Sequence, residues 1–432
     1  MNILITGASG FIGSQIVTDL LAAGHNLFCC ARNIAYAHNI FPGVEIIACD
    51  FYQDHSPADW LPRLKNIDVV INCVGILYHP NKQKVWDAHF NAPKALFTAC
   101  VQAGVKKIIH ISALGIEKSQ TEYAKSKKSA EEFILSLPIP AIILRPSLVY
   151  GRGSYGGTSL FRGLAGLPGI LPLPGKGKQK FQPVHLADLS QAIVQLVQIP
   201  LQEKLILSAV GPEKITLKDF LLKLRAWLGF RPAINLSIPF TFLKLGAFFG
   251  NFIPYSVLNK DSLSMLSQDN VAEDTDTQQF QKIIGFVPQR FSQGVYRQPS
   301  TVQDHWHARL YFLRPLLQLS IAFIWLWTAI CSALFYPKSD SFNLLAQVGV
   351  TPMWQPILLY GASMLNALLG LSVLVRIQVK KSCLLQIAVI ILYSAILSWK
   401  MPHLWLEPFA PLAKNIPLLV AILIYMNIDP ER

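Results

Sequence analysis

Tyr123 and Lys127 are four residues apart in a stretch, 123–136, that has the pattern of a helix. This spacing puts both side chains on one face of the helix. A phenol has a reference pKa of about 10, too high for proton transfer at neutral pH, but a nearby ammonium group stabilises the phenolate. The pair could therefore act as a general acid or base. On its own such a pair is usually structural, so its meaning depends on the rest of the chain.

Three glycines, Gly7, Gly10 and Gly13, fall where a predicted strand at 3–6 must turn sharply into a predicted helix at 11–23. Glycines there let the backbone approach a pyrophosphate, and the helix N-terminus points at its negative charge. Glycines also serve ordinary tight turns. Because this turn directly follows an apolar strand, which is the context that the motif requires, we predict nucleotide binding.

The ends of the next strands carry further candidate nucleotide contacts. Arg32 follows the second predicted strand, where the adenosine ribose of a dinucleotide would lie. A guanidinium suits a 2′-phosphate, which favours NADP(H). An arginine that stacks on adenine would tolerate NAD, and this alternative stays open. Asp50 ends the third strand and could face the adenine amino group, while 72–75 would end the fourth strand beside the cofactor.

Apolar runs alternate with helical patterns from residue 1 to about 150. The predicted strands are 3–6, 27–31, 44–48, 68–73, 107–112 and 141–145. Helices between them, such as 91–103, indicate an α/β fold with a doubly wound parallel sheet. Residues 151–295 are more irregular and rich in Gly and Pro, with helices expected at 185–198 and 216–228. We assign them to the end of the sheet domain and a small substrate-side subdomain.

The formal net charge is +13, but basic and acidic residues are mixed along the chain. No nucleic-acid-binding motif accompanies this excess, so we expect contacts with an anionic cofactor or a membrane surface and no nucleic-acid partner. The 7 cysteines lie within or beside apolar runs, with no C-x-x-C pair or Cys/His cluster. This pattern predicts reduced thiols and no metal site.

The C-terminal part has the composition of a membrane domain. Its first three apolar runs hold no charged residue and have about the length that crosses a hydrocarbon core of roughly 30 Å. The fourth run is short and needs residues from 411 onward to span. We predict an all-α, four-helix transmembrane domain with spans at about 315–336, 353–375, 382–399 and 411–428.

Basic residues are unevenly distributed among the connections of this domain. Arg309 and Arg314 precede the first span, and Arg376, Lys380 and Lys381 lie between the second and third. The other connections hold fewer. The positive-inside rule then predicts a multi-pass protein of the cytoplasmic (inner) membrane, with the N-terminal domain, the second connection and the C-terminus in the cytoplasm.

A polar stretch at 289–303 looks like a connection between the two parts. We therefore expect a nucleotide-binding domain at 1–295, a linker at 296–310 and a membrane domain at 311–432.

Residues 1 to about 295 resemble an extended or atypical short-chain dehydrogenase/reductase. The glycine turn matches the cofactor turn of that family, 72–75 its fourth-strand motif, and Tyr123 with Lys127 its active-site pair. Residues 145–151 match the segment beside the nicotinamide, and 183–188 match a later element of the extended family.

Two further resemblances cover the rest of the chain. Residues 211–217 resemble the NAD(P)H-binding accessory subunit of respiratory complex I and its bacterial relatives. The tail, notably 408–417, resembles the four-helix DoxX-like membrane family.

The resemblance implies a set of site residues. The catalytic residues would be Tyr123, Lys127 and Ser112. The cofactor-binding residues would be Gly7, Gly10, Phe11, Ile12, Gly13, Arg32, Asp50, Val74, Gly75, Lys127 and Pro146. Family members commonly place the catalytic Ser or Thr one or two residues later than Ser112, where this chain has Ala113 and Leu114. Either Ser112 takes that role or the hydrogen-bond donor is missing.

These observations lead to one preferred function and two alternatives. We expect a membrane-anchored NAD(P)H-dependent oxidoreductase that acts on a lipophilic carbonyl compound or quinone. One alternative is a nucleotide-binding structural or sensor module of a membrane complex, without turnover. The other is an NAD-dependent epimerase or dehydratase of a nucleotide sugar.

The lipophilic substrate rests on residues 238–258, which hold five phenylalanines and one tyrosine, with Lys244 as the only charge. They could form a core helix of the small subdomain. Alternatively they form a lipophilic pocket or a lip that faces the membrane, which polar substitutions at Phe248 and Phe249 would disrupt.

Overall fold

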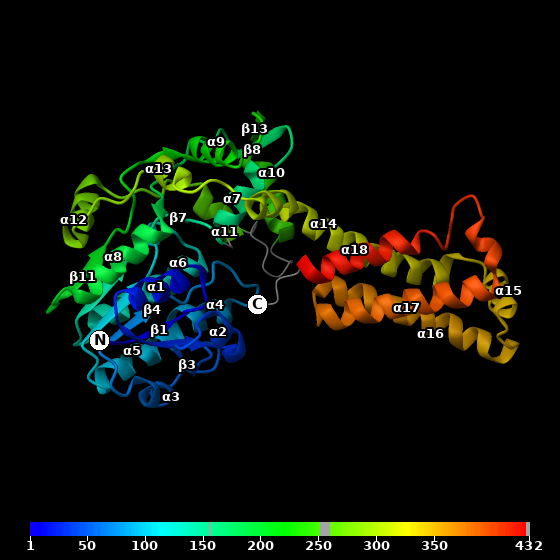
Figure 1. The fold of residues 1–432 in the computed structure, drawn as a ribbon, viewed down its shortest axis with the longest axis horizontal. Helices are drawn as coiled ribbons and strands as arrows, with labels where there is room; N and C mark the ends of the chain where they lie inside the picture. The colour runs from blue at the N-terminus through cyan, green and yellow to red at the C-terminus, as the bar shows by residue number, and fades with distance from the viewer. Residues whose placement is uncertain (155–156, 251–259, 429–432) are drawn as a thin grey trace. The chain divides into compact units, whose positions relative to one another are not determined.

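The computed structural model describes residues 1–154, 157–250 and 260–428 (Figure 1). Its backbone contacts divide the chain into two compact units, Met1–Ala308 (unit 1) and Arg309–Arg432 (unit 2). Helix α14 (Val302–Ile330) begins in unit 1 and continues into unit 2.

Unit 1 is built on a seven-stranded parallel sheet with the strand order β11-β6-β5-β4-β1-β2-β3. The strands are β1 (Asn2–Thr6), β2 (Asn26–Ala31), β3 (Glu45–Ala48), β4 (Val69–Asn72), β5 (Lys107–Ile111), β6 (Ala141–Leu144) and β11 (Lys204–Leu207). The six predicted strands are all present within one residue at each end. The doubly wound parallel sheet is therefore confirmed, and β11, which pairs with β6, is an addition.

Helices cover both faces of the sheet because successive strand residues point to opposite sides (Figure 1). In β1, Ile3 and Ile5 belong to one apolar core and Leu4 to the other. The first core includes residues of α1 (Phe11–Ala22), α8 (Leu186–Gln198) and α12 (Asp274–Ile284). The second includes residues of α3 (Pro57–Trp60), η1 (Leu61–Leu64), α5 (Ala92–Gln102) and α6 (Glu122–Ser136). Shorter helices α2 (Ile34–Ile40), α4 (Lys82–Trp86) and η2 (Asp87–Asn91) lie in the connections.

A smaller subdomain follows the sheet and has its own core, which includes Phe161, Phe220 and Phe291. It contains three two-stranded pairs, β7 (Val149–Tyr150) with β10 (Val184–His185), β9 (Lys180–Phe181) with β12 (Ile215–Thr216), and β8 (Ile170–Pro174) with β13 (Ile234–Ile238). Its helices are α7 (Gly157–Ala165), α9 (Leu217–Trp227), α10 (Phe240–Gly250), α11 (Lys260–Leu266) and α13 (Phe291–Tyr296). Of the expected apolar segment 238–258, residues 251–258 and the Phe249 side chain lie outside the described part.

The residues expected to form a linker are partly helical in the structure. Within 289–303, α13 packs into the subdomain core with Phe291 fully buried. Within 296–310, the chain is helical from Val302 onward. The reason is Asp304, which is buried, accepts a hydrogen bond from the Thr301 amide at 2.9 Å and lies 3.6 Å from the Arg162 guanidinium. This carboxylate anchors the first turn of α14 in unit 1.

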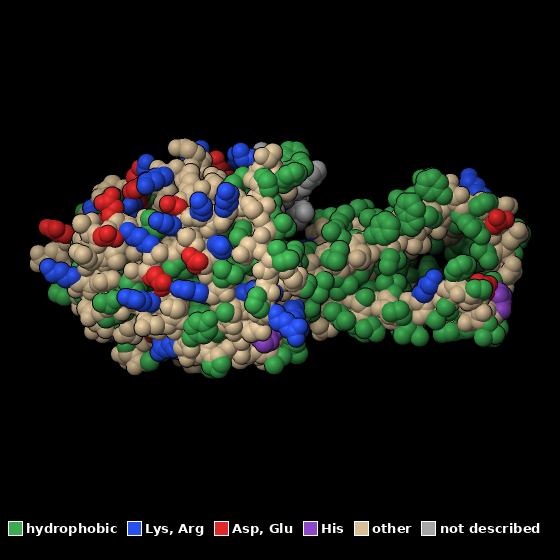
Figure 2. All heavy atoms as spheres, turned by 90° about the horizontal axis from the view of Figure 1, so that it is seen from above, with side chains coloured by type: hydrophobic (Ala, Val, Ile, Leu, Met, Phe, Trp, Pro, Cys, Tyr) green, Lys and Arg blue, Asp and Glu red, His purple; other side chains and the backbone are tan. Residues whose placement is uncertain are grey.

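Unit 2 is helical. After α14 come η3 (Cys331–Phe335), α15 (Lys338–Val348), η4 (Pro352–Trp354), α16 (Gln355–Val375), α17 (Val379–Lys400), η5 (Pro402–Trp405) and α18 (Asn415–Ile428). Among the described residues, three stretches are long and apolar enough to cross a membrane, Val302–Phe335, Pro352–Val375 and Val379–Lys400. The expected fourth span is a shorter apolar helix of 14 residues, α18. On the face shown in Figure 2, this unit carries many hydrophobic side chains and few charged ones.

Polar side chains are enclosed among the helices of unit 2. Gln386 of α17 is fully buried, and its Oε1 accepts a hydrogen bond from the Trp325 indole of α14 at 2.8 Å. The hydroxyls of Ser372 and Ser382 lie 2.6 Å apart and join α16 to α17. Hydrogen bonds of this kind help to hold apolar helices together where the hydrophobic effect between them is weak.

Candidate functional site

The glycine turn joins β1 to α1 and is tightly packed. Gly7 adopts a positive φ of +69°, and a Cβ there would lie 3.0 Å from the backbone nitrogen of Val74. A Cβ at Gly13 would overlap the carbonyl oxygen of Gly7, so α1 is packed directly on the turn. Gly10 is the N-cap of α1 and provides no side-chain cap. The first amides of the helix therefore lack a side-chain partner at this end, which suits an anionic ligand.

Asn72 fixes the neighbouring end of β4 against this turn. Its Oδ1 accepts hydrogen bonds from the Thr6 hydroxyl at 2.7 Å and from the Val74 amide at 3.2 Å. Its Nδ2 must then donate to Nδ1 of His110, 3.2 Å away. These bonds hold Val74 and Gly75 beside the glycine turn, as the nucleotide-site interpretation requires.

Lys127 is buried at the centre of the candidate site. Thr121 caps α6 by accepting a hydrogen bond from the Ala124 amide at 3.2 Å, and this helix carries Lys127 inward. The ammonium donates to the carbonyl oxygen of Ile111 at 2.9 Å and lies 5.7 Å from the centre of the Tyr123 ring. Burial lowers the pKa of Lys127 to about 8, although Glu131 and Cys73 oppose this shift. A Cβ at Gly75 would be 3.6 Å from Nζ, so a larger residue would crowd the ammonium.

The Tyr123 phenol is protonated in this environment, because burial raises its pKa above the ordinary value. The resting site is therefore prepared to donate a proton from Tyr123.

His89 is a site residue that the sequence does not reveal. Its ring packs edge-on against the Tyr123 ring with centroids 5.2 Å apart. Nε2 lies 3.0 Å from the Ile76 amide, which can only donate, so this nitrogen is unprotonated. Nδ1 lies 2.9 Å from the Ser126 hydroxyl. Burial and the nearby Lys127 lower the pKa of His89 well below its usual range, and the ring acts as a neutral support for Tyr123.

Ser112 directly follows the carbonyl that holds Lys127. Its backbone amide donates to the Leu144 carbonyl oxygen at 2.7 Å. Its side chain is buried, and its hydroxyl has no hydrogen-bond partner among the described residues. A buried hydroxyl without a partner costs free energy unless a ligand satisfies it. This orphaned hydroxyl agrees with a role for Ser112 toward a bound molecule.

The segment that contains Pro146 is held next to this strand end. The Pro146 carbonyl oxygen accepts a hydrogen bond from the Leu114 amide at 2.9 Å. The Ser147 hydroxyl donates to the carbonyl oxygen of Asn270 at 2.9 Å, and Asn270 in turn donates to the Leu114 carbonyl oxygen at 2.8 Å. Asn270 thus ties the segment after α11 to the ends of β5 and β6.

A second buried arrangement supports α6 behind the site. Arg145, directly after β6, forms a close ion pair with Glu131, which lies four residues after Lys127 on the same helix. Both nitrogen positions Nε and Nη2 of Arg145 donate to the Glu131 carboxylate, at 3.0 and 2.5 Å. This ion pair holds α6 against the sheet and thereby fixes the position of Lys127.

Arg32 lies directly after β2, and in the folded chain two further residues, Tyr52 and Lys84, lie near it. Its guanidinium carbon is 5.4 Å from the centre of the Tyr52 ring, and the Lys84 ammonium is 5.1 Å from the same ring. Within the described ranges neither Arg32 nor Lys84 forms a salt bridge with a carboxylate, so an anion could neutralise both. Asp50 accepts a hydrogen bond from the Tyr52 amide at 3.0 Å, which orders the loop that carries this ring.

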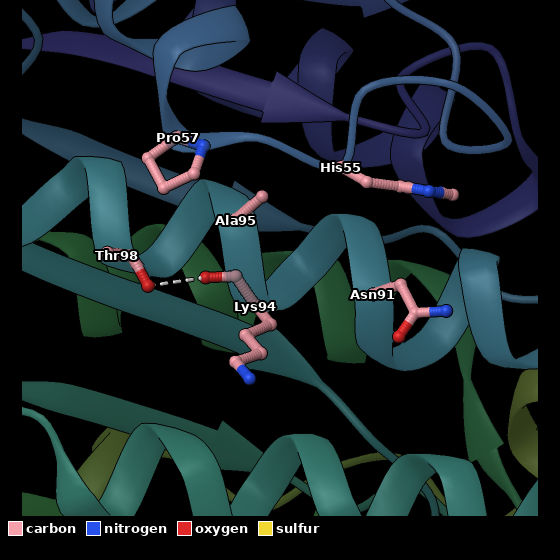
Figure 3. Close-up of a pocket in the computed structure, with 6 residues that line it drawn as sticks. All are labelled: His55, Pro57, Asn91, Lys94, Ala95 and Thr98. Atoms are coloured by element: carbon pink, nitrogen blue, oxygen red, sulfur yellow. Dashed lines mark hydrogen bonds between the residues drawn. The ribbon is translucent and has the colours of Figure 1, made fainter.

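The candidate site differs from the surface pocket in Figure 3. That pocket, on α3 and α5, contains no residue of the glycine turn or the Tyr123–Lys127 pair. Its lining residues are His55, Pro57, Asn91, Lys94, Ala95 and Thr98. Across the described ranges no cluster of three or more metal-ligating side chains is present.

Comparisons with known proteins match both parts of the chain. Residues 3–204 match the model of the NAD-dependent epimerase/dehydratase family, and residues 322–423 match that of the DoxX-like family. The mouse protein NADH dehydrogenase [ubiquinone] 1 alpha subcomplex subunit 9 is 27% identical over 271 residues, covering 59% of this chain and 69% of the relative. The ceramide reductase of Caulobacter vibrioides is 24% identical over 238 residues, covering 54% of this chain and 72% of the relative.

Solved structures of related fold include MoeE5 in complex with UDP-glucuronic acid and NAD, with a TM-score of 0.54 and 20% identity over 69% of this chain and 97% of that one. The dTDP-glucose 4,6-dehydratase DesIV of Streptomyces venezuelae has a TM-score of 0.55 and 18% identity over 73% of this chain and 100% of that one. At these identities the structures support the fold. The chain therefore joins an N-terminal domain of the NAD-dependent epimerase/dehydratase type to a C-terminal DoxX-like domain.

Proposed function

We propose that this protein is a membrane-anchored, NAD(P)H-dependent oxidoreductase that reduces a lipophilic carbonyl compound or quinone. The observation that carries the proposal is the placement of Lys127, held by the Ile111 carbonyl oxygen within 5.7 Å of the Tyr123 ring and next to Gly75. Such an arrangement serves proton transfer at a carbonyl oxygen.

In carbonyl reduction each residue of the candidate site would have a separate role. A bound reduced nicotinamide would supply the hydride for the carbonyl carbon. Tyr123 would donate its phenolic proton to the carbonyl oxygen, and its raised pKa keeps that proton in place until the reaction begins. The Lys127 ammonium would stabilise the phenolate that remains. The Ser112 hydroxyl would donate a hydrogen bond to the same oxygen before the proton moves.

The preference for a lipophilic substrate has two supports. One relative is named a ceramide reductase, and ceramide is a lipid. The chain also carries three stretches long and apolar enough to span a bilayer, which would keep the site near substrates that partition into lipid.

A panel assay on the protein purified in detergent tests the function. We expect NADPH to be consumed with a long-chain ketone or a quinone and not with UDP-glucose. Conversion of UDP-glucose without net consumption of cofactor would instead identify an epimerase. Tight nucleotide binding without any turnover would identify a structural subunit.

A structural role is the second candidate because a specific observation favours it. By its name the mouse relative is a subunit of NADH dehydrogenase, and it aligns with 59% of this chain. Ala113 and Leu114 also stand where related enzymes commonly carry the catalytic hydroxyl. In that case the protein would bind a nucleotide and a membrane partner and leave the redox chemistry to other subunits.

Replacing Arg32 by aspartate should reverse the cofactor preference that we propose, from NADPH to NADH. The carboxylate repels a 2′-phosphate and accepts a hydrogen bond from a free ribose hydroxyl. A hydrogen bond to a charged group contributes about 1.5–3 kcal/mol, so NADPH affinity should fall by about tenfold to a hundredfold. Lys84→Ala should lower NADPH affinity in the same direction and leave NADH affinity unchanged.

Titration with both nucleotides in parallel measures the effect of Arg32. The matched control is Lys65→Asp, which makes the same charge change on an exposed residue before the start of β4. A wild-type protein that already prefers NADH would refute the proposed role of Arg32.

The N-terminal unit is proposed to lie in the cytoplasm, which reporter fusions can check. A reporter after residue 432 should be active in the cytoplasm, and one inserted near Asp340 should be exposed outside. The critical element is α18, whose 14 residues extend only about 21 Å as a helix. An external C-terminus would mean that only three helices cross the bilayer.

A further inference from the structure

An exposed apolar surface lies on the small subdomain of unit 1. Its residues belong to β8, β13 and α10, whose positions are labelled in Figure 1. Its members are large aliphatic and aromatic side chains with at least 41% of their surface exposed. We call this set the apolar patch, and it consists of Ile170, Ile234, Leu236, Phe242, Leu245 and Phe248.

The strand pair formed by β8 and β13 carries apolar residues on both of its faces. On its inner side Leu171 and Leu173 are buried in the subdomain core. On the other side Ile234 pairs in register with Ile170 and is 74% exposed. A strand pair with one face in water normally carries polar residues on that face. The outer face of this pair is therefore suited to an apolar environment.

Helix α10 extends this face. Phe242 and Leu245, three residues apart on the helix, are 68% and 58% exposed, whereas Ala247 is fully buried. The helix follows β13 directly, and a Cβ at Gly175 would lie 3.0 Å from the Phe240 ring. The strand pair and the helix are thus held together as one surface. Monomeric soluble proteins rarely expose such a contiguous set, which usually marks a site of interaction.

The charges around the patch are basic. Lys176 and Lys178 are exposed in the turn after β8, Arg231 is exposed just before β13, and Lys244 lies on α10 itself. The sequence contains no Asp or Glu between residues 220 and 260. A basic rim around an apolar centre matches an anionic lipid surface, because acyl chains meet the centre and headgroup phosphates meet the rim.

The loop that enters β13 also lies beside the start of the first candidate membrane span. The Phe230 ring is 5.4 Å from the His305 ring, which is on the first turns of α14. Arg225 donates to the carbonyl oxygens of Arg231 at 2.6 Å and of Ala165 at 2.8 Å. A Cβ at Gly166 would lie 2.7 Å from the Ala308 side chain, so α14 begins in close contact with this part of unit 1. The patch therefore lies in the part of unit 1 that also holds the first turns of α14.

We infer that the apolar patch docks on the lipid bilayer, with Phe242 and Leu245 inserted among the acyl chains and the surrounding lysines and Arg231 on anionic headgroups. This contact is independent of whether the protein catalyses a reaction. It holds unit 1 on the membrane surface.

Quenching of a fluorescent label by lipid tests this inference on the full chain. Phe242→Cys and the control Val287→Cys are labelled with bimane and reconstituted in vesicles of phosphatidylcholine and phosphatidylglycerol that contain a lipid with a nitroxide on its acyl chain. Val287 is 64% exposed on unit 1 but lies outside the patch. Labelled wild-type protein corrects for the native cysteines. We expect several-fold stronger quenching at position 242 than at position 287.

Two further experiments test the role of the basic residues and of the anionic headgroups. The double variant Lys176→Glu/Lys178→Glu, made in the Phe242→Cys protein, should reduce the quenching, and so should vesicles of phosphatidylcholine alone. Equal quenching at positions 242 and 287 would overturn the docking. Energy transfer between labels at 242 on different molecules, without quenching by lipid, would show that a second copy covers the patch and would also overturn it. Quenching that is unaffected by both charge arms would overturn the role of anionic headgroups.

Discussion

Replacing Gly13 by alanine or valine is expected to abolish nucleotide binding, with a loss of affinity of at least about a hundredfold. Even the single Cβ of alanine would overlap the Gly7 carbonyl oxygen, so α1 must move away from the turn. That movement displaces the helix N-terminus from the position where it would meet a pyrophosphate. A hundredfold loss corresponds to about 2.7 kcal/mol, which is the contribution of about one or two hydrogen bonds to a charged group.

Equilibrium dialysis with NADPH and NADH measures this loss in the protein purified in detergent. Gly157→Ala is the matched control, since a Cβ there meets no atom within 4 Å. Membrane insertion of Gly13→Val should stay normal, because α14 to α18 do not involve this turn. Unchanged affinity in the Gly13 variants would contradict the nucleotide site itself.

The sequence could predict this turn and the sheet around it because both depend on local patterns. A glycine has to stand where β1 turns into α1, and buried parallel strands are short, continuous apolar runs. β11 (Lys204–Leu207) stands at the edge of the sheet and was not predicted. Its existence depends on pairing with β6, which is a long-range contact.

The candidate site shows the same division between local and distant contacts. Tyr123 and Lys127 are found from their spacing on one helix. His89 cannot be found in this way, because its ring meets Tyr123 from a different helix and no spacing connects the two. Lys84 likewise approaches Tyr52 only in the folded chain.

The sequence did not predict the start of α14 for a different reason. Residues 302–310 include Asp304, His305, His307 and Arg309, which read as a polar connection. In the structure Asp304 is buried near Arg162, and the Ser159 hydroxyl lies 2.7 Å from Nε2 of His307. Polar residues that satisfy one another can therefore extend an apolar helix well beyond its apolar run.

The position of Tyr123 determines which pH dependence the proposed reaction should have. Burial raises the pKa of Tyr123, so the phenol keeps its proton throughout the neutral range. The pKa of Lys127 is lowered to about 8, so the ammonium is charged below that pH and neutral above it. Stabilisation of the developing phenolate is thus present at pH 7 and is lost as the pH rises through about 8. The turnover number for reduction should fall over the same interval.

Tyr123→Phe is expected to lower the turnover number for reduction by about a hundredfold to ten-thousandfold, the usual contribution of a general acid. Phenylalanine keeps the ring that packs on His89 at 5.2 Å, so the fold and the nucleotide affinity should be preserved. The measurement is the steady-state rate of NADPH consumption with the best substrate of the panel, alongside a nucleotide titration. Tyr36→Phe serves as the control, because Tyr36 is 43% exposed on α2. A Tyr123→Phe variant with an unchanged turnover number would exclude Tyr123 as the proton donor, whereas a loss of nucleotide affinity would assign it to binding instead.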